Sequence, residues 1–192
     1  MDPLEYFNSE LDDHAAVLAR THADLAAPFQ NMLRLWVTAI QNGHKILFFG
    51  NGGSAADAQH LSAELVVRFI NDRKPIPAIA LNTDTSALTA GANDLGYEQV
   101  FARQIDALGQ PGDIAVGFST SGTSPNIIAA LEMARQKGLV PTAFTGRDGG
   151  RMPDLTDACL IIPAQSTRRI QEMHITLGHM LCGALEQSLK LV

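Results

Sequence analysis

The chain has 192 residues and a formal net charge of −6, from 14 lysines and arginines against 20 aspartates and glutamates. It contains no basic run of the kind that binds nucleic acid, and no apolar stretch near the roughly 20 residues that a membrane-spanning helix needs. Its two cysteines, Cys159 and Cys182, have no close spacing, so neither a disulfide framework nor a thiolate metal site is indicated. We expect one domain, residues 1–192, in the reducing cytoplasm, with no nucleic-acid or membrane partner.

Two amphipathic helices, residues 4–23 and 28–41, are predicted first, because apolar residues recur there at helical spacing. They form a helical pair over residues 1–42, before an α/β part over residues 43–192. In that part, short apolar runs alternate with helical patterns, which predicts a parallel sheet covered on both faces. Strands are expected at 45–49, 77–81, 114–118, 140–145 and 158–162, and helices at 54–69, 85–90, 97–108, 125–137 and 167–191. We therefore expect a flavodoxin-like three-layer sandwich with a five-stranded sheet.

A glycine-rich loop, residues 50–54, joins the first strand to its helix. Three glycines in four positions let the backbone turn sharply and bring its amides close to a ligand. Those amides lie at a helix N-terminus, where the helix dipole favours an anion. Ser54 followed by Asp57 also fits the capping-box pattern for a helix start.

A second loop, after the third strand, is rich in hydroxyls. Its members are Ser119, Thr120, Ser121, Thr123 and Ser124. The last of them precedes a proline, which predicts an N-cap followed by proline at the first helical position. A polar turn with one capping serine would explain this loop alone. In a flavodoxin-like strand order, however, the first and third strands meet at the switch point, so both loops would line one crevice. Together they predict a phosphate site.

Gly50, Gly52 and Ala55 also fit the Gly-x-Gly-x-x-Gly/Ala pattern of dinucleotide-binding folds. A nicotinamide enzyme would need an acidic ribose partner near the end of the second strand, and Asp84 comes late in the chain for that role. A Rossmann-type dehydrogenase is therefore a distant alternative.

His60 and Glu64 are four residues apart and share a face of the helix that follows the glycine-rich loop. They could be metal ligands, or a base beside an acid, or an ordinary pair on a helix surface. The last helix offers Gln171, His174 and His179. At about 100° per residue, the two histidines lie roughly 60° and 80° from Gln171 on opposite sides. Periodicity therefore does not choose between them.

Taken together, these residues resemble the sugar isomerase (SIS) domain family, and within it the branch that isomerises phosphorylated heptoses. The resemblance covers almost the whole chain. Its motifs are Gly50-Asn51-Gly52-Gly53-Ser54-Ala55, Ala58-Gln59-His60, Glu64, Asn93-Asp94, Ser119-Thr120-Ser121-Gly122, Ser124, Thr145-Gly146-Arg147-Asp148-Gly149-Gly150 and Arg169-Ile170-Gln171-Glu172. The chain departs from this pattern at Arg168, where similar isomerases can carry an acidic residue.

The resemblance implies a homotetramer with active sites between subunits and one zinc ion per subunit. It selects His179 over His174, and the zinc ligands it implies are His60, Glu64, Gln171 and His179. The substrate-binding residues it implies are Asn51, Gly52, Gly53, Ser54, Glu64, Asn93, Asp94, Ser119, Thr120, Ser121, Ser124 and Gln171.

The implied reaction is aldose–ketose isomerisation of sedoheptulose 7-phosphate to D-glycero-D-manno-heptose 7-phosphate through an enediol, the first step toward the ADP-heptose of the lipopolysaccharide core. Our hypothesis is that Glu64 removes the C1 proton and that His179 serves the oxygen or returns the proton. One alternative is a non-catalytic SIS scaffold that binds the replication initiator, and another is a SIS isomerase of a different phosphosugar. The presence of both Glu64 and His179 favours the enzyme.

Overall fold

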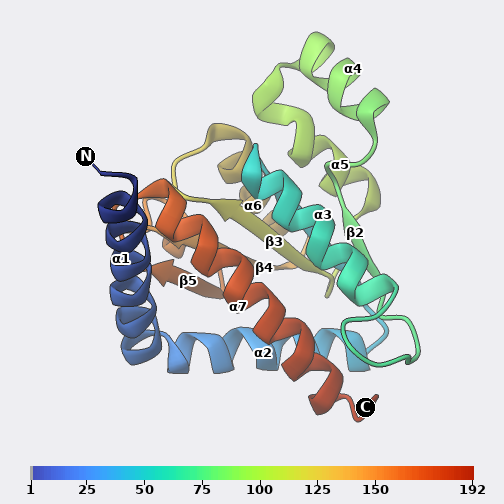
Figure 1. The fold of residues 1–192 in the computed structure, drawn as a ribbon. Helices are drawn as coiled ribbons and strands as arrows, with labels where there is room; N and C mark the ends of the chain where they lie inside the picture. The colour runs from blue at the N-terminus through green and yellow to red at the C-terminus, as the bar shows by residue number, and fades with distance from the viewer. Residues whose placement is uncertain (1) are drawn as a thin grey trace.

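A computed structural model describes residues 2–192, so Met1 of the expected N-terminal helical pair lies outside the description. Five parallel strands form one sheet in the order β2-β1-β3-β4-β5 (Figure 1). The strands are β1 (Ile46–Gly50), β2 (Ala78–Ala80), β3 (Ile114–Ser119), β4 (Val140–Gly146) and β5 (Ala158–Ile162). The order reverses at β1, which pairs with β2 on one side and β3 on the other. The flavodoxin-like sheet is confirmed, and with it the switch point between β1 and β3.

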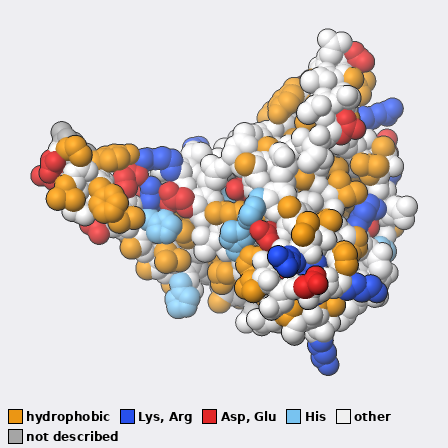
Figure 2. Space-filling view, turned by 45° about the vertical axis from the view of Figure 1, so that its right-hand side comes forward, with side chains coloured by type: hydrophobic (Ala, Val, Ile, Leu, Met, Phe, Trp, Pro, Cys, Tyr) orange, Lys and Arg blue, Asp and Glu red, His pale blue; other side chains and the backbone are white. Residues whose placement is uncertain are grey.

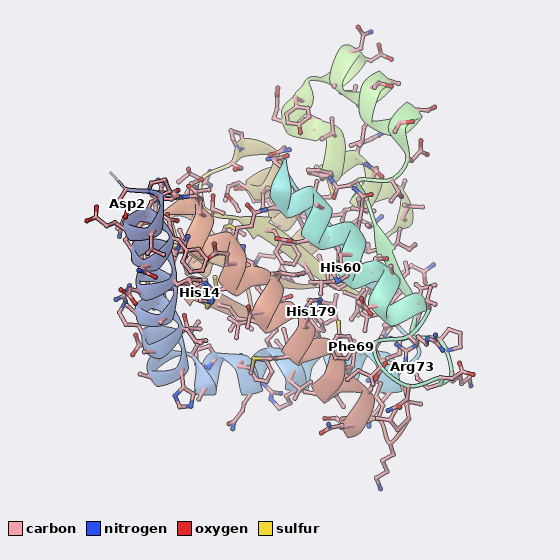
Figure 3. All side chains as sticks on the ribbon, viewed as in Figure 1. Asp2, His14, His60, Phe69, Arg73 and His179 are labelled. Atoms are coloured by element: carbon pink, nitrogen blue, oxygen red, sulfur yellow. The ribbon has the colours of Figure 1, made fainter. Side chains whose placement is uncertain are left out.

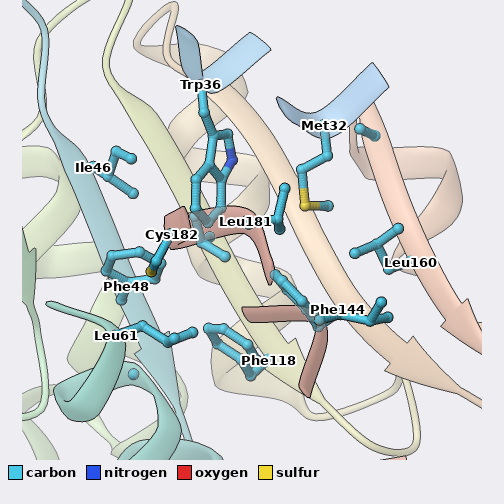
Figure 4. Packing of buried hydrophobic residues seen from close by; sticks show 14 of the residues in the cluster. Met32, Trp36, Ile46, Phe48, Leu61, Phe118, Phe144, Leu160, Leu181 and Cys182 are labelled. Carbon is cyan, nitrogen blue, oxygen red and sulfur yellow. The ribbon is translucent and has the colours of Figure 1, made fainter. Parts of the chain in front are cut away.

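Helices cover both faces of the sheet, because neighbouring residues of a strand point to opposite faces. The helices are α1 (Pro3–Asp24), α2 (Ala26–Gln41), α3 (Gly53–Val66), α4 (Thr85–Leu95), α5 (Val100–Leu108), α6 (Pro125–Gln136) and α7 (Thr167–Ser188), with 3₁₀ turns η1 (Tyr97–Gln99) and η2 (Pro153–Leu155). Phe48 packs with Trp36, Phe118, Phe144 and Leu181 in a core under α2, α3 and α7 (Figure 4). Phe49 belongs to a second core, under α5 and α6.

Two local predictions are wrong. Gly52, at φ 58°, is the N-cap of α3, and Ser54 lies inside the first turn of the helix, so no capping box forms. Asn93 and Asp94 lie on α4 and not in a loop. A third prediction holds only for the backbone, because Ser124 occupies the N-cap position of α6 without a hydrogen bond from its side chain to the helix.

Two helices stand out from the body of the molecule. Helix α1 projects to one side and carries exposed hydrophobic side chains, among them Leu4, Phe7 and Leu11 (Figure 2). Helix α4 has no buried residue, and Leu95 at its end is half exposed. Within residues 2–192, no helix is both long enough and apolar enough to span a membrane.

Candidate active site

The loops after β1 and β3 meet through a pair of asparagine side chains. Asn51, which follows β1, donates from Nδ2 to Asn126 Oδ1 at 2.9 Å. Asn126, in the first turn of α6, donates from Nδ2 to Asn51 Oδ1 at 2.8 Å. The Tyr97 hydroxyl donates to the same Asn51 oxygen at 3.0 Å. Because this pairing joins the loop after β1 to the start of α6, the two loops lie side by side at the switch point, as the sequence predicted. Asn126 was missed by the sequence reading, since one asparagine at a helix start carries no distinctive signal.

The hydroxyl-rich loop gathers its side chains at one point. Ser119 Oγ lies 3.0 Å from Ser124 Oγ and 3.4 Å from Ser121 Oγ. The Thr123 hydroxyl donates to Ser121 Oγ at 3.0 Å. Ser119 is buried and Thr120 is half-buried. The hydroxyls therefore form one cluster beside the N-terminus of α6, an arrangement suited to an anion because it offers donors together with a helix dipole.

The loop after β4 packs against the hydroxyl-rich loop. Gly122 has a positive φ of 68°, and a Cβ at this position would lie 2.0 Å from Gly149 O. The Arg151 amide donates to Gly122 O at 3.0 Å. The backbones of the two loops are thus in direct contact, which accounts for Gly150 of the sequence motif at 145–150, where a Cβ would lie 2.6 Å from Gly122 O.

His60, Glu64 and His179 form a compact group where α3 packs against α7 (Figure 3). The Nε2 atoms of the two histidines are 2.8 Å apart, and Glu64 Oε1 lies 3.2 Å from His60 Nε2. Two imidazole nitrogens and a carboxylate are ligands that zinc commonly takes, and the ligand atoms of a tetrahedral site lie roughly 3.3–3.5 Å apart at metal–ligand distances of about 2.0–2.1 Å. The three atoms lie within 4.8 Å of one another, so small side-chain shifts suffice to fit a metal ion.

Gln171 lies against the start of α3. A Cβ on Gly53 would come within 1.7 Å of Gln171 Nε2, so the glutamine packs on the bare backbone there. It also reaches Asp57, whose Oδ2 is buried without a hydrogen-bond partner among the described residues. Burial raises the pKa of Asp57 to about 6, while the charge of His60 and a hydrogen bond from Gln171 act in the opposite direction. The role of Gln171 as a fourth metal ligand remains a prediction.

The two histidines of α7 have different surroundings. His174 is fully buried between Phe118 and Phe144, its Nε2 donates to Thr145 O at 3.1 Å, and burial lowers its pKa to about 4. His179 is the one that meets His60. Burial lowers the pKa of His179, His60 lowers it further and Glu64 opposes both. The lowered pKa favours the neutral imidazole of His179, which can exchange a proton or bind a metal.

Other sequence-predicted residues lie outside these contacts. Asn93 and Asp94 are exposed on α4, where Asn93 Nδ2 donates to Asp94 Oδ1 at 2.6 Å. Arg168 donates to Tyr6 and Glu10 of α1, at 3.1 and 2.8 Å. Asp84, the residue considered for a dinucleotide, instead caps α4 by accepting from the Ala87 amide at 2.9 Å.

Comparison with known proteins identifies the family of the chain. Residues 11–146 match the family model of the SIS domain. The match covers more than half of the chain, so the chain belongs to the SIS domain family.

Relatives within that family share the whole architecture. The chain is 55% identical to phosphoheptose isomerase of Paramagnetospirillum magneticum over 181 residues, which is 94% of each chain. Among solved structures, phosphoheptose isomerase from Neisseria gonorrhoeae matches with a TM-score of 0.91 at 40% identity, over 96% of this chain and 98% of the other. The enzyme of Francisella tularensis matches with a TM-score of 0.94 at 35% identity, over 97% and 100%. Within the SIS family, the chain thus groups with the phosphoheptose isomerases, and the resemblance noted in the sequence is confirmed.

Proposed function

We propose that this protein is an aldose–ketose isomerase that converts sedoheptulose 7-phosphate to D-glycero-D-manno-heptose 7-phosphate. The group of His60, Glu64 and His179 is the observation that carries the proposal, because it puts Glu64, on the helix that begins at the glycine-rich loop, beside His179 of α7. The names of the relatives support the choice of substrate. No observation favours a scaffold function or a dehydrogenase.

The hydroxyl cluster of Ser119, Ser121 and Ser124 would hold the phosphate. The Oγ atom of each of these serines lies 3.0–3.4 Å from the Oγ atom of another, and each hydroxyl can turn its proton toward a phosphate oxygen. The start of α6 adds the positive end of the helix dipole and the Asn126 amide, because Pro125 has no N–H and the Ile127 amide already donates to Ser124 O at 3.1 Å. Thr120 of the same loop would also contact the phosphate, and residues 51–54 would lie along the sugar.

At the reacting end, Glu64 would remove the proton from C1 and return it to C2 through an enediol. Its Oε1 faces His60, which leaves Oε2 for the proton. Neutral His179 would move the hydroxyl proton between O1 and O2. A zinc ion bound by His60, Glu64, Gln171 and His179 would supply polarisation of the carbonyl oxygen.

Replacing Glu64 with glutamine tests this assignment. Glu64→Gln keeps the size of the side chain and removes the base. We therefore expect the circular dichroism spectrum to match that of the folded wild type, and turnover to fall by about 10²–10⁴-fold. Nuclear magnetic resonance of the sugar C1 signal measures isomerisation, with exposed Glu132→Gln as the matched control. Near-normal turnover in Glu64→Gln would refute the role of this residue. Chelation of metal from the wild type, followed by zinc addition, tests the metal separately.

We also propose a homotetramer with active sites between subunits. The exposed hydrophobic residues of α1, Leu4, Phe7 and Leu11, support it, as does the exposure of α4, which carries the predicted substrate residues Asn93 and Asp94. Light scattering coupled to size exclusion measures the assembly. The cytoplasmic location, the single SIS domain over residues 1–192 and the place in ADP-heptose synthesis stay predictions.

A further inference from the structure

A buried ion pair lies next to the acid–base group. Arg73, on the loop between α3 and β2, places Nε 2.6 Å from Glu186 Oε1, near the end of α7. The two side chains are only 1% and 2% exposed. In Figure 3, Arg73 lies beyond Phe69, on the same side of the molecule as His60 and His179. A pair so far from water needs a reason, because removing two charges from water costs several kcal/mol per ion.

The guanidinium of Arg73 also binds the end of the helix that carries Glu64. Its Nη2 donates to Glu64 O at 2.8 Å, and its Nη1 donates to Leu65 O at 2.7 Å. These carbonyls belong to the last turn of α3, where no following amide of the helix is available. A cation is also favourable at this negative end of the helix dipole. Arg73 therefore fixes the turn from which the Glu64 carboxylate projects.

The other half of the pair acts on His179. Glu186 Oε1 accepts from the Phe69 amide at 3.2 Å, and the Phe69 ring lies against the His179 imidazole, with centroids 5.6 Å apart and planes at 36°. Phe69 also covers Gly183, where a Cβ would lie 3.2 Å from the ring. By fixing Phe69, Glu186 limits the positions open to the His179 ring.

We propose that the Arg73–Glu186 pair is a positioning device that holds Glu64 and His179 in the arrangement needed for metal binding and proton transfer. The inference rests on the proposed isomerase function for its kinetic part, and on the geometry of the group alone for its metal part. Stability is an insufficient reason for the pair, because replacing a buried ion pair with apolar residues is often neutral or stabilising. An apolar pair would keep the packing and lose all five hydrogen bonds of the two side chains, which include one from Arg73 Nη1 to Lys74 O at 3.2 Å.

The double variant Arg73→Met with Glu186→Leu separates the two explanations. We expect a thermal midpoint within about 5 °C of the wild type. We also expect kcat reduced at least about tenfold, KM within about threefold because the phosphate loops are untouched, and zinc affinity reduced about 10–100-fold, as for residues that orient metal ligands. Zinc affinity is measured on metal-free protein by competition with a chromophoric chelator, so it does not depend on turnover. The corresponding substitutions in an exposed pair on α5, Arg103→Met with Asp106→Leu, are the matched control and should change none of these values.

A folded double variant with wild-type kcat and wild-type zinc affinity overturns the proposal. If that variant does not fold, Arg73→Lys carries the test, because lysine keeps the charge but has no fork to reach Glu186 and both carbonyls at once. It should still weaken zinc binding about tenfold, and unchanged affinity again overturns the proposal. If the wild type itself does not isomerise sedoheptulose 7-phosphate, the proposed function fails, whereas the zinc titrations still decide the role of the ion pair.

Discussion

His174 gives a quantitative test of how burial sets charge in this fold. In the folded protein its pKa falls from 6.5 to about 4, because the ring is fully buried and only a hydrogen bond to Thr145 opposes the shift. Between pH 4 and 6.5 the unfolded chain therefore holds a proton that the folded chain does not. Stability must rise with pH across this window and fall as the pH drops through it. At about 1.4 kcal/mol per pH unit, the total is about 3 kcal/mol.

His174→Gln removes the titrating ring and keeps a donor for Thr145. We expect the free energy of unfolding of the wild type, minus that of the variant, to grow by about 3 kcal/mol from pH 4 to pH 7. Urea unfolding of metal-free protein at half-unit pH steps measures the difference, which cancels other groups that titrate in both proteins. A difference that stays constant within about 1 kcal/mol would show that the ring is charged or hydrated when folded. At pH 7.5 the variant should keep wild-type kcat, whereas His179→Gln should not.

Three further substitutions test the surroundings of the site. Asp57→Asn should remove a pH effect of opposite sign. Burial raises the pKa of Asp57 from 3.8 to about 6, so about 3 kcal/mol of stability that is present below pH 3.8 is lost as the pH rises through 6. Urea unfolding curves that shift equally with pH in the wild type and the variant would contradict this. Gly122→Ala should raise KM at least about tenfold, a loss of roughly 1.4 kcal/mol in binding, because φ is positive and a Cβ would lie 2.0 Å from Gly149 O. An unchanged steady-state KM would exclude the hydroxyl-rich loop from phosphate binding. Gly178→Ala should lower the free energy of unfolding by about 1–3 kcal/mol and weaken zinc binding, since a Cβ would lie 2.6 Å from Leu61 Cδ1. Chelator competition measures the zinc affinity, and wild-type affinity in the variant would contradict the prediction.

Much of the fold could be predicted because its signals are local. The strands are continuous apolar runs, and β5 was expected at residues 158–162 and is found as Ala158–Ile162. Glycines and a serine–proline pair marked both loops of the crevice. Once parallel strands are assumed, the rule that ligands bind at the switch point brings these loops together, and the Asn51–Asn126 pair shows that they meet.

The errors arose where tertiary contacts or backbone freedom outweighed a local pattern. Gly91 suggested the end of α4, yet glycine costs a helix only about 1 kcal/mol, and Leu88 with Ala92 packs against the core one turn apart. The helix therefore continues to Leu95. The Ser54 pattern failed because Gly52 adopts a positive φ and starts α3 earlier.

The group of His60, Glu64 and His179 was the part least predictable from periodicity, because it depends on how closely two helices pack, and only the resemblance to the SIS family selected His179. His60 and His179 are 119 residues apart in sequence, and nothing local brings them together. Their neighbours do: Leu61 of α3 rests on Gly178 of α7, where a side chain would collide with it. A residue without a side chain next to one histidine thus lets the helices approach until the two ring nitrogens are 2.8 Å apart. The phosphate end proposed for the site lies in two loops, whereas the proposed acid–base group depends on the α3–α7 contact. Any residue that sets the spacing of these helices would therefore act on that group without touching the sugar.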